Sequence, residues 1–334
     1  MIKDIKLSGF KSFLDETIHL NQLTVLTGLN SSGKSTVIQA LRMVNRMCMK
    51  KNCLLAGYGD WKELKNKNYD DEPMIEVFDD KERHFVCGEI NKDAVNPLES
   101  GFPKLIYLSA SRYGPQDIIP VFAGESDIDE VGNNVVKNIK THQSDILPEA
   151  LWLEEGQGVT HEYMLDAWVQ KISPDVKFSS EMVEKADASY TTFNGYRAKN
   201  VGFGLSFTLP VITSLLEGVL TPDSLVIIEN PEAHLHAKAQ TEIADLIARC
   251  VEAGAQVIVE THSDHLFDGL RIYVKEHPGF EKKMNCYWFE LDEDKNTEAT
   301  LIELNSKGRI VNLTIPSHFM DQFEYNSQRL LFGR

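Results

Sequence analysis

Eight residues near the start of the chain have the types and spacing of a phosphate-binding loop. They read GLNSSGKS, from Gly28 to Ser35, and match the pattern G-x-x-x-x-G-K-[ST]. Glycines let a backbone curl around an anion, and its N–H groups and a following helix N-terminus then face the charge. The lysine reaches the outer phosphates, and the last hydroxyl binds Mg²⁺. The alternative is a plain strand–turn–helix with a surface lysine. We predict a nucleotide site made by Gly28, Asn30, Ser31, Ser32, Gly33, Lys34, Ser35 and Thr36, with Ser35 as a magnesium ligand.

A second candidate lies about 200 residues later, where SLVIIE is followed by NPEAHLH. The apolar run predicts a buried parallel strand, and an acid at its carboxyl end faces the ligand crevice of such a sheet. Glu229 is therefore predicted to hold Mg²⁺, mainly through water. The next residue, Asn230, can orient water but cannot take up a proton. Glu232 is then the remaining carboxylate, and its direction depends on the turn at Pro231.

A third strand end, VIVETHSDHL, carries Thr261 and His262. At that position His262 could contact the γ-phosphate or the attacking water, whereas we expect His265 to lie on the surface. His234 and His236 could suggest a metal site, but no further ligand is apparent. Cys48 and Cys53 likewise lack a second pair with zinc-ligand spacing.

Composition restricts the function classes. The 334 residues are 42% hydrophobic and 25% charged, as in a soluble globular protein. Five scattered cysteines suit a reducing compartment, and we see neither a signal peptide nor an apolar run long enough to span a membrane. We therefore expect a cytoplasmic protein without membrane contact.

The net charge of −16 opposes nucleic-acid binding over most of the surface. DNA contact would need a local patch, and the segment Arg42–Lys67 is the candidate. We expect one helix face to carry Arg42, Arg46 and Lys50, with an ordinary solvated face as the alternative. The segment's other charged residues are Lys51, Lys62, Lys65 and Lys67, against Asp60 and Glu63.

Alternating strands and helices must position these residues, and the alternation predicts a mainly parallel sheet surrounded by helices. Helices are predicted over residues 34–50 and 238–253, with apolar residues at helical spacing. Polar helices and loops are predicted over 114–200. Two hairpins are predicted, one over residues 73–90 and a later one from MNCYWFELD and ATLIELN, and HFMDQFEYNSQRLLF predicts a closing helix.

With GLNSSGKS, ENPEAHLHAKAQ and ETHSDHL in this order, the chain resembles the ABC-type ATPases of the RecF, SMC and OLD kind. It looks most similar to the OLD-like branch, which includes ATPase subunits of bacterial anti-phage systems such as PtuA of Septu. SGFKSF resembles the first strand of that family, YLSASRYGP the strand after the P-loop helix, and NVGFGLSFTLP its signature segment. GRIVNLTIPSHFMDQF resembles a C-terminal segment of one subgroup.

The resemblance implies an α/β fold: a P-loop ABC-type head with a mainly parallel sheet, helices on both faces, an antiparallel β part and a helical lobe. Residues 1–113 and 217–334 would form the nucleotide-binding lobe, and residues 114–216 the helical lobe that ends in the signature. In the family two heads sandwich two ATP molecules.

The resemblance also assigns residues. Gly204 and Ser206 would face the ATP of the partner head, although Phe207 departs from the family's glutamine and a packing segment is the alternative. Gln116 would be the Q-loop glutamine, and Arg112 would neutralise phosphate or form a structural ion pair.

These features predict an ATPase that uses ATP and Mg²⁺, dimerises head to head, and hydrolyses slowly because Asn230 occupies the usual glutamate position. It would regulate a separate effector, a nuclease or toxin, in anti-phage defence or DNA processing, because the chain has neither a coiled-coil arm nor room for a nuclease domain. The alternative is an ATP-gated DNA-binding clamp of repair or recombination with little net hydrolysis. A metabolic P-loop kinase or GTPase fits poorly, since no guanine-specificity motif or substrate lid is evident.

Overall fold

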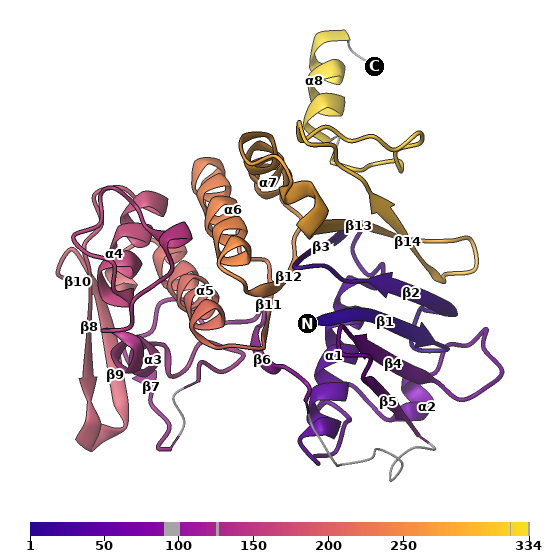
Figure 1. Cartoon of the computed structure of the whole chain (residues 1–334), viewed down its shortest axis with the longest axis horizontal. Coiled ribbons are helices and arrows are strands. Elements are labelled where there is room, and N and C mark those ends of the chain that lie inside the picture. Colours follow the sequence, from indigo (N-terminus) through magenta and orange to yellow (C-terminus); the bar gives the residue numbers. More distant parts are fainter. Residues whose placement is uncertain (90–100, 125–126, 321, 333–334) are drawn as a thin grey trace. The chain divides into compact units, whose positions relative to one another are not determined.

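The computed structural model describes residues 1–89, 101–124, 127–320 and 322–332 (Figure 1). Within these ranges the chain divides into two compact units. The first, which we call the P-loop unit, contains Ile2–Ser100, His262–Asp264 and Val274–Arg334. The second, which we call the signature unit, contains Gly101–Thr261 and His265–Tyr273, together with Met1. These bounds differ from those of the expected lobes, and the lobe division stays a prediction.

The P-loop unit contains an antiparallel sheet of order β2-β1-β4-β5. Its strands are β1 (Ile2–Ser8), β2 (Asp15–His19), β4 (Met74–Asp79) and β5 (His84–Gly88). The predicted early hairpin is β4–β5. A second group of strands is β3 (Leu23–Gly28), parallel to β13 (Met284–Leu291), which pairs antiparallel with β14 (Thr297–Ile302). The predicted late hairpin is therefore β13–β14.

Helix α1 (Lys34–Cys48) follows β3 directly and packs on β3, β4 and β5. Its buried face includes Val37, Ile38, Leu41 and Val44, as the apolar spacing predicted. The unit also contains the short helix α2 (Trp61–Leu64) and the closing helix α8 (Gln322–Phe332). The strand–loop–helix order thus places the glycine-rich loop at the carboxyl end of a fully buried strand.

In the signature unit, a parallel group of order β12-β11-β6 carries the second and third strand ends. Its strands are β6 (Lys104–Leu108), β11 (Ser224–Glu229) and β12 (Gln256–Glu260). Helix α5 (Phe203–Leu220) packs on β6 and β11, and α6 (Ala237–Glu252) packs on β12 and α5. Helix α7 (Asp264–Glu276) contributes residues to both units. The predicted α/β class, with mainly parallel strands and an antiparallel part, is confirmed.

The region 114–200 is less helical than the sequence indicated. It contains the helices α3 (Val135–His142) and α4 (His161–Ile172), but also an antiparallel sheet in which β9 pairs with β7, β8 and β10 (Figure 1). These strands are β7 (Ile119–Pro120), β8 (Phe178–Val183), β9 (Ala188–Phe193) and β10 (Tyr196–Arg197). The residues of β8 read FSSEMV, in which polar and apolar residues do not alternate, and half of its positions are exposed. Its apolar signal was therefore too weak to predict a strand.

Helix α5 also departs from the expectation that no run could span a membrane. It has 18 residues with a mean hydropathy of 1.6, so by length and composition alone it could cross a membrane. However, 61% of it is buried inside the structure, and Leu209, Val211, Ile212, Leu215 and Leu216 are in the core. This is how the central helix of a folded domain packs.

Candidate functional site

The glycine-rich loop has the backbone geometry that a phosphate cradle requires. Gly28 (φ 140°) ends β3, Ser31 has a φ of 63°, and Gly33 (φ 107°) caps the N-terminus of α1. A Cβ at Gly28 would collide with the carbonyl oxygen of Phe289. Only glycine combines this positive φ with so close a backbone approach. The N-terminus of α1 therefore opens onto a tightly curved loop, an arrangement that suits an anion.

Lys34 is held over this loop. Its Nζ donates hydrogen bonds to the carbonyl oxygens of Gly28 (3.1 Å) and Leu29 (2.6 Å), and only 3% of the residue is exposed. The Ser32 hydroxyl also donates to Leu29 O, at 2.7 Å. Asn30 and Ser31 are exposed, Ser35 is half-buried and Thr36 is buried. The predicted nucleotide-binding residues of this loop thus surround one positive charge at a helix N-terminus.

His262 lies beside the same loop within the P-loop unit. Partial burial and the nearby charge of Lys34 lower its pKa, while a hydrogen bond with the Gly28 backbone opposes the shift. The imidazole is therefore neutral at neutral pH: one ring nitrogen donates to the Gly28 backbone, and the other can accept one hydrogen bond. The structure brings His262 to the P-loop, where its predicted contact with the γ-phosphate or water stays a prediction.

In the signature unit, the carboxylate of Glu229 is oriented by the neighbouring strand β6 and the residues after it. Its Oε1 accepts from the Tyr107 hydroxyl and its Oε2 from the Ala110 N–H, both at 3.0 Å. An ionised carboxylate offers about four lone-pair sites, so both oxygens can still accept a further bond. Such hard oxygen donors suit Mg²⁺ held through water.

Asn230 is in the left-handed region, with a φ of 45°. Its N–H donates to Glu260 O at 2.8 Å, so the main chain turns away from β11 at this residue. Asparagine adopts this conformation more readily than glutamate does, which gives a local reason for its presence. Within the described part of the chain, its buried Oδ1 has no hydrogen-bond partner. The amide oxygen is available to hold a water molecule but cannot act as a base.

The turn at Pro231 directs Glu232 toward the end of β12. Its Oε1 accepts from the Thr261 hydroxyl at 2.8 Å. The two strand ends that the sequence singled out, after β11 and after β12, are therefore linked by one side-chain hydrogen bond. This arrangement holds a carboxylate two residues beyond Asn230, where the base role that we predicted for Glu232 can be tested.

Arg112 is 2% exposed and binds main-chain oxygens. Its guanidinium donates to the carbonyl oxygens of Ser109 (3.2 Å), Glu229 (2.8 Å), Asn230 (2.7 Å) and Phe207 (3.1 Å). Burial lowers the pKa of Arg112 to about 10, and the charges of Glu232 and Glu229 oppose the shift. The sequence allowed two roles for Arg112, a contact with phosphate or a structural ion pair. In the structure, this side chain instead ties the end of β11 to the start of α5.

The signature residues lie at the N-terminus of α5, which Gly202 caps. A Cβ at Gly204 would come within 2.8 Å of His234 O, so this glycine is needed for a close backbone contact. The Ser206 hydroxyl is buried, has no hydrogen-bond partner among the described residues, and lines a cavity of about 30 Å³ together with Gln116. The structure thus brings Gln116 and Ser206 together, with the hydroxyl turned inward. A contact of Gly204 or Ser206 with ATP on a second head stays a prediction.

Phe207, which departs from the family's glutamine, packs against His234 with ring centroids 4.4 Å apart and the ring planes tilted by 45°. His236 caps α6, because its Nδ1 accepts from Lys238 N–H at 3.3 Å. The two histidines therefore have packing and capping roles. Across the described ranges, no group of three or more His, Cys, Asp or Glu residues is placed to hold a metal ion.

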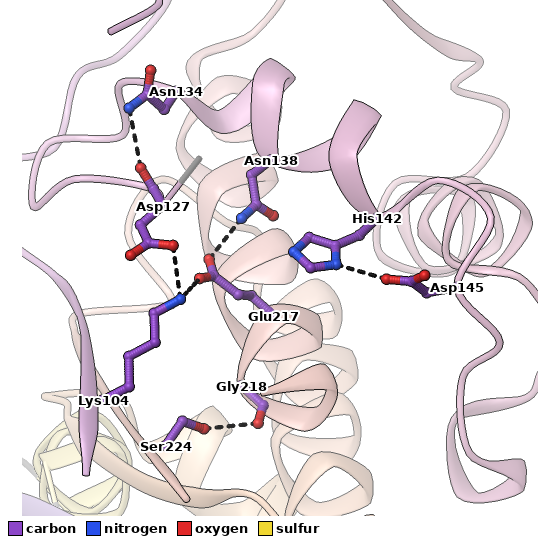
Figure 2. A network of polar contacts seen from close by, with 9 residues as sticks. All are labelled: Lys104, Asp127, Asn134, Asn138, His142, Asp145, Glu217, Gly218 and Ser224. Atoms are coloured by element: carbon purple, nitrogen blue, oxygen red, sulfur yellow. Dashed lines mark hydrogen bonds and ion pairs between the residues drawn. The ribbon is translucent and has the colours of Figure 1, made fainter. Parts of the chain in front are cut away.

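The other end of α5 is anchored by a buried polar network (Figure 2). Glu217, 1% exposed, accepts from Lys104 Nζ at 2.9 Å and from Asn138 Nδ2 at 2.9 Å. Lys104 also pairs with Asp127 at 2.7 Å. Burial raises the pKa of Glu217, and Lys104 opposes the shift. The network joins α5 to the first residue of β6 and to α3, and so supports the helix that carries the signature.

The basic segment only partly matches its prediction. Arg42 and Arg46 lie on α1, but α1 ends at Cys48 and Lys50 has a φ of 58°. Lys50 is therefore outside the helix, and the expected three-residue basic face is wrong. The segment's exposed lysines are Lys50, Lys51, Lys62 and Lys67.

Two residues that sequence reasoning missed, Ser12 and Thr297, lie against the P-loop. Thr297, the first residue of β14, contacts Ser32 and Gly33 of the loop, and Ser12 contacts Thr297. Ser12 and Thr297 are separated by 285 residues, and neither belongs to a phosphate-binding motif. No local sequence signal points to them.

Comparisons with known proteins find ATPase domains in two regions of the chain. Residues 1–155, which contain the P-loop, match a family model described as an AAA ATPase domain. Residues 171–268, which contain Glu229, Asn230, Glu232 and His262, match a model described as an AAA domain, putative AbiEii toxin, Type IV TA system. No curated protein sequence matches the chain significantly.

Solved structures of SMC heads show the same fold at low identity. An SMC head bound to the C-terminal winged-helix domain of ScpA superposes with a TM-score of 0.51 at 15% identity, over 91% of this chain and 98% of that chain. The SMC head of Pyrococcus yayanosii, with a coiled coil and joint, gives 0.51 at 10% identity, over 90% and 97%. A RecF recombination mediator gives 0.44 at 12% identity, over 90% and 98%. The chain thus has the fold of SMC heads, and two of its regions match ATPase domains.

Proposed function

We propose that the protein binds ATP with Mg²⁺ and hydrolyses it slowly. The observation that carries this proposal is the Gly28–Ser35 loop, in which Lys34 lies over the loop carbonyls at the N-terminus of α1. A lysine and a helix N-terminus beside the same loop form a site for the outer phosphates of a nucleotide. The match to an ATPase domain over the same residues supports it.

The residues after β11 support a slow reaction. In this proposal Glu229 binds the magnesium ion through water, and the ion neutralises charge on the phosphates. Asn230 orients the attacking water with its amide oxygen. Glu232, held by Thr261, is the carboxylate that takes the water's proton, and neutral His262 accepts a hydrogen bond from the water through the ring nitrogen that is not bonded to Gly28. The usual base position is occupied by a residue that cannot accept a proton, so the bound state lasts long.

We further propose that two copies dimerise around ATP and act on a separately encoded effector, a nuclease or toxin, in anti-phage defence or DNA processing. In this dimer Gly204 and Ser206 of one copy face the ATP of the other, with Gln116 beneath them. The exposed N-terminus of α5, at Gly202 and Phe203, supports such a contact. An SMC head that binds a separate protein, ScpA, supports a separate partner here. The loss of the three-residue basic face leaves the DNA-clamp alternative with weaker support.

ATP binding and turnover of Asn230→Glu, with Asn230→Gln as its matched control, test the slow reaction. Glutamate should raise turnover at least tenfold, because a general base at this position contributes on the order of 10²–10⁴-fold, and part of that is offset by left-handed strain. Glutamine has the same length without a base and should leave turnover low. An equal response of the two variants would contradict the role of Asn230.

A further inference from the structure

The C-terminal hairpin β13–β14 contacts both ends of the phosphate loop. At the first end, Phe289 O accepts a hydrogen bond from Leu29 N–H at 3.2 Å and lies directly against Gly28. At the second end, Thr297 lies against Gly33, where an added Cβ would be 2.5 Å from its hydroxyl oxygen. The loop is therefore supported by residues from the opposite end of the sequence.

Thr297 is 3% exposed, and its hydroxyl lies between two partners. Its Oγ1 is 2.9 Å from Ser32 O and 2.7 Å from the Ser12 hydroxyl. A hydroxyl carries one proton, so Thr297 donates to the Ser32 carbonyl while it accepts from Ser12. The Thr297 N–H also donates to Ser12 O at 2.7 Å, which fixes the two side chains relative to each other.

The direction of the Ser32 carbonyl determines the direction of the next N–H. In a planar trans peptide, the C=O of one residue and the N–H of the next point in opposite directions. Because Thr297 draws Ser32 O toward the hairpin, the Gly33 N–H points away from the hairpin. Gly33 caps α1, so its N–H belongs to the donors at the anion-binding helix end.

We propose that Thr297, with Ser12 behind it, is a positioning residue that holds the Ser32–Gly33 peptide in its phosphate-binding orientation. This inference rests on the proposed ATP binding. Thr297→Val keeps the shape of the side chain but removes the hydrogen bond. It should weaken ATP binding about tenfold, because one net hydrogen bond then no longer favours the binding-competent peptide. Thr297→Ser keeps the hydroxyl and should bind within about threefold of the wild type.

The test uses titration calorimetry of the full chain with Mg·ATP, for the wild type, Lys34→Ala, Thr297→Val, Thr297→Ser and Ser12→Ala. Amide hydrogen exchange of the loop without nucleotide provides a second readout. We expect faster exchange at Gly33 in Thr297→Val, near-normal exchange in Thr297→Ser, and an intermediate effect in Ser12→Ala. If Thr297→Val fails to fold, Thr297→Ala takes its place, because alanine and serine at this position differ only by the hydroxyl.

Two results would overturn the inference: ATP affinity and loop exchange of Thr297→Val equal to the wild type, or equal losses in Thr297→Val and Thr297→Ser. If the wild type binds no ATP, the proposed function fails. The exchange measurement then still decides whether Thr297 holds the loop, so the two failures are distinguishable.

Discussion

Replacing Arg112 by methionine removes a buried guanidinium that donates to four main-chain oxygens. Hydrogen bonds from a charged donor each contribute about 1.5–3 kcal/mol, and four would contribute roughly 6–12 kcal/mol if they were additive. Burial of the charge costs several kcal/mol, so we expect a net loss of about 3 kcal/mol in the free energy of unfolding. With a urea dependence of about 3 kcal/mol per molar, the unfolding midpoint should fall by about 1 M.

The assay is urea unfolding followed by tryptophan fluorescence, and two of the four tryptophans, Trp152 and Trp168, lie in the signature unit with Arg112. Arg197→Met is the matched control, because Arg197 is exposed on β10 and its loss should cost less than about 0.5 kcal/mol. ATP affinity is measured on the same samples. If Arg112→Met kept the wild-type midpoint but lost ATP binding, Arg112 would be a phosphate ligand and the reasoning would be wrong.

Further predictions concern buried groups. Burial lowers the pKa of His161 from 6.5 to about 4. The free energy of unfolding should therefore be highest above pH 6.5 and fall by up to about 3 kcal/mol as the pH drops to 4. Urea unfolding at several pH values measures this fall, and we expect His161→Phe to lack it. Gly204→Ala should lower the free energy of unfolding by about 1–3 kcal/mol, because the added Cβ would press on the His234 carbonyl. Gly202→Ala is the control and should lower it by less than about 1 kcal/mol, because its Cβ would meet nothing within 4 Å. Thermal unfolding measures both. A hydrogen bond with Cys87 lowers the pKa of Cys53 to about 7, so iodoacetamide should label Cys53 with a midpoint near pH 7. Cys250 is buried and should react only when the protein unfolds. Mass spectrometry reads the labelling at each cysteine, and equal labelling of the two would contradict the prediction.

The local parts of the fold and site could be read from the sequence. The loop Gly28–Ser35 carries its own conformational signal in its glycines, and β3, β11 and β12 are continuous apolar runs that only a buried strand explains. Helices α1 and α6 have strong apolar spacing, and their bounds lie close to the predicted ones. Residues adjacent in sequence, such as Glu229 and Asn230, were therefore placed correctly at a strand end.

The remaining features depend on contacts between distant segments. Thr297 reaches Ser32 across 265 residues, and Arg112 reaches Phe207 across 95. No spacing rule applies at such separations. The extended conformation of β8 depends on its pairing with β9 rather than on its own half-exposed, polar residues. Lys50 shows a different failure: helical spacing predicted a shared face, but α1 ends two residues before it.

Nucleotide binding by a lysine-dependent loop, with slow turnover, is the central claim. Steady-state hydrolysis and equilibrium binding of Mg·ATP, measured together on the wild type and on Lys34→Ala, test it most directly. We predict ATP binding that Lys34→Ala abolishes, and a turnover number well below about 10 s⁻¹, the median for enzymes. Binding that survives in Lys34→Ala, or a wild-type turnover above about 10 s⁻¹, would contradict it.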